Sequence, residues 1–145
     1  MTNKLSQFLN TSIFFVKNFN PNWEYKILLC VDDSQATKRA VLLSTQISKQ
    51  FNAEIISITV SKTSFFGKGY RNAHKWAERY FKRVGITFNS RLETGNPVDI
   101  FISEAGENHI IIMGKAKGNE IMKFIKGSKP IHTAQRANCP ILLVN

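Results

Sequence analysis

Five short apolar runs, separated by segments with helical spacing, limit what this chain can fold into. The runs cover residues 25–31, 53–60, 86–92, 110–113 and 141–144. Short runs that are rich in β-branched residues are typical of strands buried on both faces of a parallel sheet. The third run alternates between apolar and polar residues more than the others do, so we expect it at the edge of the sheet.

The segments between the runs are predicted to be helices. They cover residues 36 to about 51, 73–84 and 98–105, with a last helix near 130–137. In the first segment, residues spaced four, three and four apart lie on one helix face, namely Ala36, Ala40, Leu43 and Ile47. Ser34 is a plausible N-cap of this helix, and Pro97 is well placed near the start of the third helix.

This strict alternation of strand and helix predicts an α/β fold. We expect a three-layer, Rossmann-like architecture with an open parallel sheet of five strands and helices on both faces. In such sheets, ligands bind beyond the carboxyl ends of the strands, at the point where the strand order reverses. Asp32 follows the first strand and Gly114 follows the apolar run of the fourth. We therefore expect these two residues to meet at one crevice.

A segment rich in glycine and lysine follows the fourth run. It contains Gly118 and Gly127, several lysines, and Ser128 where the last helix is expected to start. Backbone N–H groups near glycines and at the positive end of a helix are well suited to hold a phosphate. Binding of a phosphate or a nucleotide is the favoured interpretation, and a purely structural helix cap is the alternative.

Composition limits the classes of protein to consider. The 145 residues suggest one main domain, and 20 Lys and Arg against 10 Asp and Glu give a net charge of +10. This excess serves solubility, or it attracts phosphates. No apolar run approaches the roughly 20 residues that cross a bilayer, and the N-terminus has no signal-peptide pattern. Cys30 and Cys139 are expected to be reduced core residues, which favours the cytoplasm.

Residues 1–24 form a predicted N-terminal extension to a domain that covers residues 25–145. The spacing of several apolar residues there partly fits a short amphipathic helix, which Phe14 and Phe15 interrupt. Two interpretations stay open. The extension packs on the domain, or it contacts a partner or a second copy of the chain, because so many phenylalanines should not stay in water.

Residues 25–145 resemble the universal stress proteins. The resemblance is carried by VDDS at 31–34 with alanines in the helix that follows, GNP at 95–97, Met113-Gly114, Gly127-Ser128, and CPILLV at 139–144. It implies a fold like that of the adenine nucleotide alpha hydrolases, with the strand order 3-2-1-4-5. The spacing departs at one position: the family's middle glycine falls at Lys117, and a glycine comes one residue later, at Gly118.

The resemblance also implies a nucleotide site. In it, Asp32, with Val31 before it, meets the ribose or the adenine, and the Val60 backbone meets the adenine edge. Met113 and Gly114 line the nucleoside pocket. The phosphates meet the remaining candidates, Lys117, Gly118, Gly127, Ser128 and Lys129. Lys117 either occupies the space of a phosphate or offers it an ammonium group.

The ligand implied is an adenine nucleotide. ATP is expected, with or without Mg²⁺, and AMP or another adenine nucleotide is the alternative. The implied function is a stress-response regulator that forms a homodimer, often through the last strand. We expect no catalytic residues and at most slow ATP hydrolysis. A nucleotide-free interaction module of the same fold is the second hypothesis, and a small nucleotide-hydrolysing or nucleotidyl-transferring enzyme is the third.

Other interpretations have less support in the sequence. The acidic pair Asp32-Asp33 also fits a response-regulator receiver domain, but the third strand leads to no aspartate at the position that would be phosphorylated. No histidine has a partner at metal-ligand spacing, so no metal site is expected. Basic residues between 62 and 83 are interleaved with Tyr70, Trp76 and Tyr80. Because these aromatics have core spacing, a solvated face is favoured and nucleic-acid binding is not expected.

Overall fold

A computed structural model describes residues 13–15, 19–114 and 139–144. The elements are β1 (Ile13–Phe15), β2 (Lys26–Cys30), α2 (Ala36–Phe51), β3 (Ile55–Ser61), α3 (Lys68–Val84), β4 (Phe88–Thr94), α4 (Pro97–Glu104), β5 (His109–Gly114) and β6 (Ile141–Val144). The predicted last helix, near 130–137, lies outside the described residues. The five predicted strands are present as β2 to β6, and the first three predicted helices as α2 to α4.

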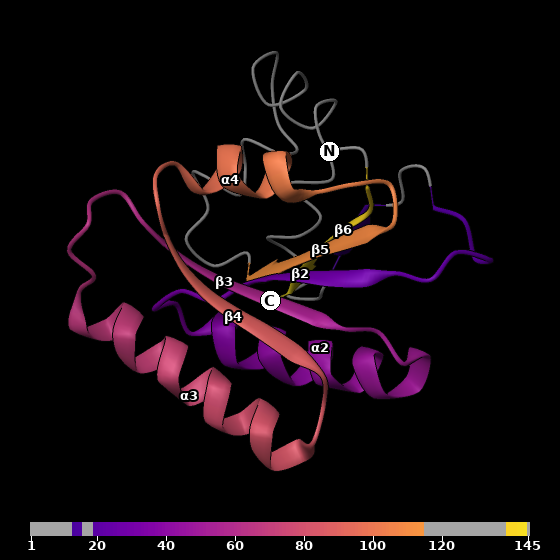
Figure 1. The fold of residues 1–145 in the computed structure, drawn as a ribbon, viewed down its shortest axis with the longest axis horizontal. Helices are drawn as coiled ribbons and strands as arrows, with labels where there is room; N and C mark the ends of the chain where they lie inside the picture. The colour runs from indigo at the N-terminus through magenta and orange to yellow at the C-terminus, as the bar shows by residue number, and fades with distance from the viewer. Residues whose placement is uncertain (1–12, 16–18, 115–138, 145) are drawn as a thin grey trace.

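The strands form one sheet in the order β1-β6-β5-β2-β3-β4. From β6 to β4 all neighbours are parallel, which confirms the predicted order 3-2-1-4-5. β4 lies at the edge, as its alternating sequence predicts. Helices α2 and α3 cover one face of the sheet and α4 lies on the other, so the three layers are visible in Figure 1.

β1 is a strand that the sequence did not reveal. Ile13–Phe15 pairs antiparallel with β6, with Phe14 opposite Leu142. The helix predicted for the N-terminal extension is therefore wrong at these three residues. The partner strand lies at the other end of the chain, and such pairing leaves no mark on local spacing. As a consequence, β1 covers the edge of β6 that would otherwise be open.

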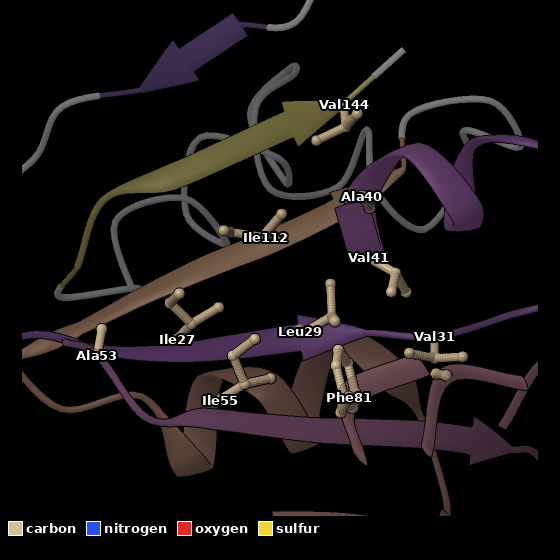
Figure 2. Close-up of a cluster of buried hydrophobic side chains, with 11 residues drawn as sticks. Ile27, Leu29, Val31, Ala40, Val41, Ala53, Ile55, Phe81, Ile112 and Val144 are labelled. Atoms are coloured by element: carbon tan, nitrogen blue, oxygen red, sulfur yellow. The ribbon is translucent and has the colours of Figure 1, made fainter. Parts of the chain in front are cut away.

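The larger core lies between the sheet and helices α2 and α3 (Figure 2). Side chains from four strands meet those of the two helices there, including Ile27, Leu29, Ile55, Ile112, Val144, Val41 and Phe81. The rings of Phe81 and Phe88 are 5.2 Å apart between centroids and tilted by 46°, a separation within the range of favourable aromatic pairs. This core fixes α2 and α3 against the strand ends from which they emerge.

The end of α3 explains why β4 starts later than predicted. Gly85 adopts the left-handed conformation, with φ of 73°, and its N–H donates to the carbonyl groups of Phe81 and Lys82. The N–H of Ile86 also donates to Phe81 O, at 3.3 Å. This pattern is a helix C-terminal cap. It holds Ile86 at the helix end, so the strand covers Phe88–Thr94 rather than residues 86–92.

The predicted environment of the cysteines is confirmed where it can be described. Cys139 is buried and Cys30 is partly buried. Within the described residues, no helix has the length and hydropathy needed to cross a membrane.

Candidate functional site

The candidate site lies where β2, β3 and β5 end. Cys30 is opposite Ile58 in the pairing of β2 with β3. Asp32 and Val60, each two residues further along its strand direction, therefore lie at the same height at this edge of the sheet. Leu29 is opposite Ile112, which places Gly114 beside the start of the Asp32 loop. β2 and β5 are adjacent although α2, β3, α3, β4 and α4 separate them along the chain. The strand order reverses here, which is where α/β sheets bind ligands.

Gly114 packs directly on the first turn of α2. A Cβ atom placed on Gly114 would lie 2.7 Å from Ala36 Cβ, 3.3 Å from the Ala36 carbonyl carbon and 3.4 Å from Ser34 Oγ. Ala36 is fully buried, so it cannot move aside easily. The end of β5 and the loop after β2 are therefore in contact, as the sequence predicts, and the absence of a side chain at position 114 permits this approach.

Asp32 organises the loop between β2 and α2. Its Oδ1 accepts hydrogen bonds from the Ser34 N–H at 2.9 Å and from Thr37 Oγ1 at 2.5 Å. The Asp32 N–H donates to Thr37 Oγ1 at 3.2 Å. These bonds hold the carboxylate close to the N-terminus of α2, where the helix dipole favours negative charge.

The prediction that Ser34 is the N-cap of α2 is wrong. The N-cap residue is Gln35, whose side chain makes no capping bond. Ser34 is buried and its Oγ lies 3.3 Å from Thr37 Oγ1. Local sequence rules identified a capping residue close to the helix start. The turn before α2 is instead stabilised by the hydrogen bond between Thr37 and Asp32. The sequence signal for this bond is an Asp and a Thr five residues apart.

The remaining described site candidates are apolar and buried. Val31 faces α2 and α3, whereas Val60 and Met113 belong to the cluster on the α4 side of the sheet. Val60 is 7% exposed and Met113 is 3% exposed. Their side chains can shape the floor of a site, but a ligand would meet mainly their backbone groups. The predicted phosphate-binding residues Lys117, Gly118, Gly127, Ser128 and Lys129 lie outside the described residues.

A cavity of about 360 Å³ opens on the other side of the Asp32 loop, between α2 and α3. Its lining includes Asp32, Asp33, Lys38, Asn72, Trp76 and Arg79. Lys38 Nζ lies 5.5 Å from the centroid of the Trp76 ring, close enough for a cation–π interaction. The sequence did not predict this cavity, because the cavity depends on how α2 and α3 lie relative to each other.

The described histidines have structural partners. His74, on α3, places Nδ1 at 3.3 Å from Thr59 Oγ1 and Nε2 at 3.3 Å from Ser90 Oγ. It thereby joins α3 to the two neighbouring strands β3 and β4. Within the described residues, no group of three or more His, Cys, Asp or Glu side chains could hold a metal ion.

His109 should make the stability of the fold depend on pH. Burial lowers the pKa of His109 below its usual value of about 6.5, and the charge of Lys26 lowers the pKa further, whereas Glu104 opposes the shift. The folded state thus favours the neutral ring. Below the unfolded-state pKa, the unfolded chain binds more protons, so the free energy of unfolding should fall as the pH drops from about 6.5 through the folded-state pKa.

Urea denaturation of the wild type and His109→Gln between about pH 5 and pH 8 measures this effect. The wild type should lose more stability than the variant at the acidic end. Equal slopes in the two proteins would show that His109 does not contribute to the pH dependence.

Comparison with known proteins identifies the fold. No protein-family model matches the chain, and no curated protein matches its sequence. Solved structures do match. A universal stress protein in complex with cAMP is 25% identical, with a TM-score of 0.63, and the match covers 86% of this chain and 98% of that one.

Two further similar structures share the fold at lower identity. The universal stress protein of Archaeoglobus fulgidus in complex with dAMP is 17% identical, with a TM-score of 0.60 and coverage of 83% and 98%. An Arabidopsis thaliana protein of the same family, with AMP bound, is 16% identical, with a TM-score of 0.56 and coverage of 83% and 90%. The resemblance to universal stress proteins is confirmed, and the chain has their α/β fold.

Proposed function

We propose that this chain is a universal-stress-type protein that binds an adenine nucleotide beyond the carboxyl ends of β2 and β5. One observation carries the proposal: the Asp32 loop and Gly114 are in contact at the point where the strand order reverses. Structures of the same fold have cAMP, dAMP or AMP bound. ATP is the nucleotide we expect, because the lysine- and glycine-rich segment after β5 can neutralise several phosphates.

The roles of the residues follow from their positions. Both hydrogen bonds from the α2 turn end on Oδ1 of Asp32. Its other carboxylate oxygen, Oδ2, is the proposed acceptor for ribose hydroxyl groups or an adenine amine. Val60 and Gly114 offer backbone groups at the same level of the sheet. Gly127, Ser128 and Lys129 are proposed to bind the phosphates through N–H groups, a hydroxyl and an ammonium group.

We propose a regulatory role in the cytoplasm rather than fast catalysis. Oδ1 of Asp32 is engaged in the turn before α2 and its Oδ2 is the proposed acceptor for the nucleoside, whereas a general base needs to be within reach of the water that it activates. Slow hydrolysis of ATP stays compatible with this arrangement.

We also propose that the chain forms a homodimer. Because β1 covers the edge of β6, a second copy could extend the sheet there only from β1 or after displacing it.

Nucleotide binding is tested by thermal denaturation with ATP, AMP, cAMP and dAMP, and by mass spectrometry of protein purified without added ligand. A ligand at 100 times its Kd stabilises the native state by about 2.7 kcal/mol, so Tm should rise by several degrees. Gly127→Val should abolish the rise. Gly67→Ala, whose added Cβ would meet nothing closer than 3.9 Å, should preserve it.

The outcomes separate the hypotheses. No shift with any adenine nucleotide at millimolar concentration would overturn the proposal and favour a nucleotide-free interaction module. An unchanged shift in Gly127→Val would remove Gly127 from the site. Release of phosphate at more than trace rates would favour a nucleotide-hydrolysing enzyme.

A further inference from the structure

The outer face of α3 carries an unusual concentration of positive charge. The helix contains six of the chain's 20 Lys and Arg residues and one of its 10 acidic residues. The six are Lys68, Arg71, Lys75, Arg79, Lys82 and Arg83, and all six are exposed. At 100° per residue they fall within an arc of about 120°, over a length of about 22 Å. We call these six residues the basic stripe.

The charge of the basic stripe is compensated only in part, by Asp32 and Asp33, which line the cavity beside Arg79. No ion pair among the described residues uses one of its side chains. The one acidic residue of α3, Glu78, lies at the border of the arc, and its carboxylate is 3.5 Å from Nε2 of His74. An ordinary solvated helix face carries charges of both signs. A face of one sign instead attracts a polyanion.

Aromatic rings border the basic stripe on the side of α2. Trp76 and Tyr80 are half-buried and stack with their centroids 5.6 Å apart and 10° between their planes. Lys38 and Arg83 lie over these rings, at 5.5 Å from Trp76 and 5.3 Å from Tyr80. Trp76 and Tyr80 therefore contribute only part of their surface to the core, and each ring has a cation beside it.

The cavity between α2 and α3 adjoins these rings. Arg79 of the basic stripe and Trp76 at its border both line the cavity, and Asp32 and Asp33 add carboxylates and Asn72 an amide. Its volume of about 360 Å³ lies near the lower end of the range of small-ligand pockets, roughly 300–1,000 Å³. One nucleoside unit fits such a volume. A row of cations beside an aromatic-lined hollow is how proteins bind single-stranded nucleic acids, with phosphates on the cations and a base against a ring.

We infer that the basic stripe and the adjoining cavity form a binding surface for single-stranded nucleic acid. The phosphates lie along Lys75, Arg79 and Lys82, and one unstacked base enters the cavity beside Trp76. A duplex could follow the stripe, but it would have to release a base to fill the cavity. An anionic membrane fits less well because the apolar side of α3 cannot insert: Ala77 is 1% exposed and Phe81 is fully buried.

Fluorescence anisotropy with short labelled single strands of DNA and RNA tests this inference, with the matching duplex and vesicles of phosphatidylserine and phosphatidylcholine as comparisons. Non-specific affinities of this kind are about 10⁻⁴–10⁻⁶ M at physiological salt, and log K falls by about 0.7 per phosphate contact for each unit of log salt concentration. Lys75→Glu/Lys82→Glu should weaken binding at least 10-fold and reduce the salt slope by more than one.

Lys26→Glu/Lys49→Glu is the matched control, since it changes the net charge equally at two exposed lysines outside α3. It should keep the wild-type affinity within about threefold. Equal losses in the two double variants would show a general charge effect and overturn the assignment. Vesicle binding without single-strand binding would overturn it in favour of a membrane.

Entry of a base into the cavity is tested separately, by the fluorescence of Trp76. Trp23 and Trp76 are the two tryptophans of the chain, so Trp23→Phe leaves Trp76 as the sole tryptophan emitter. Its fluorescence should change when a single strand binds and change less with the duplex. Tight single-strand binding without any change in Trp76 emission, or equal affinity for duplex and single strand, would show that no base enters the cavity. ATP binding is measured separately, so its failure leaves this test intact.

Discussion

Gly114→Val should destabilise the fold more than most single substitutions, by about 3 kcal/mol or more, and should abolish nucleotide binding. Even alanine adds an atom only 2.7 Å from Ala36 Cβ, and overpacking of a tight contact costs roughly 1–3 kcal/mol. Valine adds two further methyl groups against buried Ala36 and Ser34. Relief of this contact requires β5 and α2 to separate at the proposed site. The urea midpoint at unchanged m-value measures the loss.

A double-mutant cycle tests whether the contact with Ala36 causes the loss. Ala36→Gly removes the nearest atom, so Gly114→Ala should cost less in the Ala36→Gly background than in the wild type, with a coupling of about 0.5 kcal/mol or more. Gly67→Ala is the control, because its added Cβ has its nearest neighbour at 3.9 Å. If Gly114→Val were within about 0.5 kcal/mol of the wild type, the close approach would not limit this position.

Most of the architecture could be predicted because β2 to β6 and α2 to α4 are marked by local sequence. The buried strands are short apolar runs, and the helices between them require parallel connections. The adjacency of β2 and β5, and with it the meeting of Asp32 with Gly114, also depends on the strand order. The resemblance to universal stress proteins supplied the strand order, and the structure confirms both.

Features that depend on distant contacts could not be predicted. β1 pairs with β6 from the opposite end of the chain, and three apolar residues in a row fit a strand or a buried helix turn equally well. The position of β4 depended on Gly85, whose left-handed conformation keeps Ile86 in the cap of α3. Ser34 has the residue type of an N-cap, but Gln35 holds that position without a side-chain capping bond, and the Ser34 N–H instead donates to the carboxylate of Asp32.

The interpretation of α3 also depends on contacts that the sequence does not show. Core spacing in the sequence predicts Ala77, which is buried, but it misses Phe81, which is fully buried. It does not show that Trp76 and Tyr80 lie at the border, half-buried, with cations beside their rings. Nor does it show a cavity, which requires the relative positions of α2 and α3. The sequence also does not show which charges pair, and no ion pair among the described residues uses a side chain of the basic stripe.

Asp32 has a structural and a proposed ligand-binding role, and two substitutions should separate them. Asp32→Ala removes both hydrogen bonds that end on Oδ1 and leaves the Ser34 N–H and the Thr37 hydroxyl without their acceptor. The free energy of unfolding should fall by about 1–3 kcal/mol. Asp32→Asn keeps an oxygen at this position, so its stability should stay within about 1 kcal/mol of the wild type.

Nucleotide affinity should respond differently. A hydrogen bond to a charged group contributes about 1.5–3 kcal/mol, and each 1.4 kcal/mol corresponds to about tenfold in Kd. Asp32→Asn should therefore weaken adenine nucleotide binding at least 10-fold, measured by calorimetric titration, although the protein is nearly as stable as the wild type. Asp33→Asn removes the same charge from the neighbouring exposed carboxylate and should leave the affinity nearly unchanged. Wild-type affinity in Asp32→Asn would restrict Asp32 to holding the turn before α2, and equal losses in the two variants would point to net charge rather than contact.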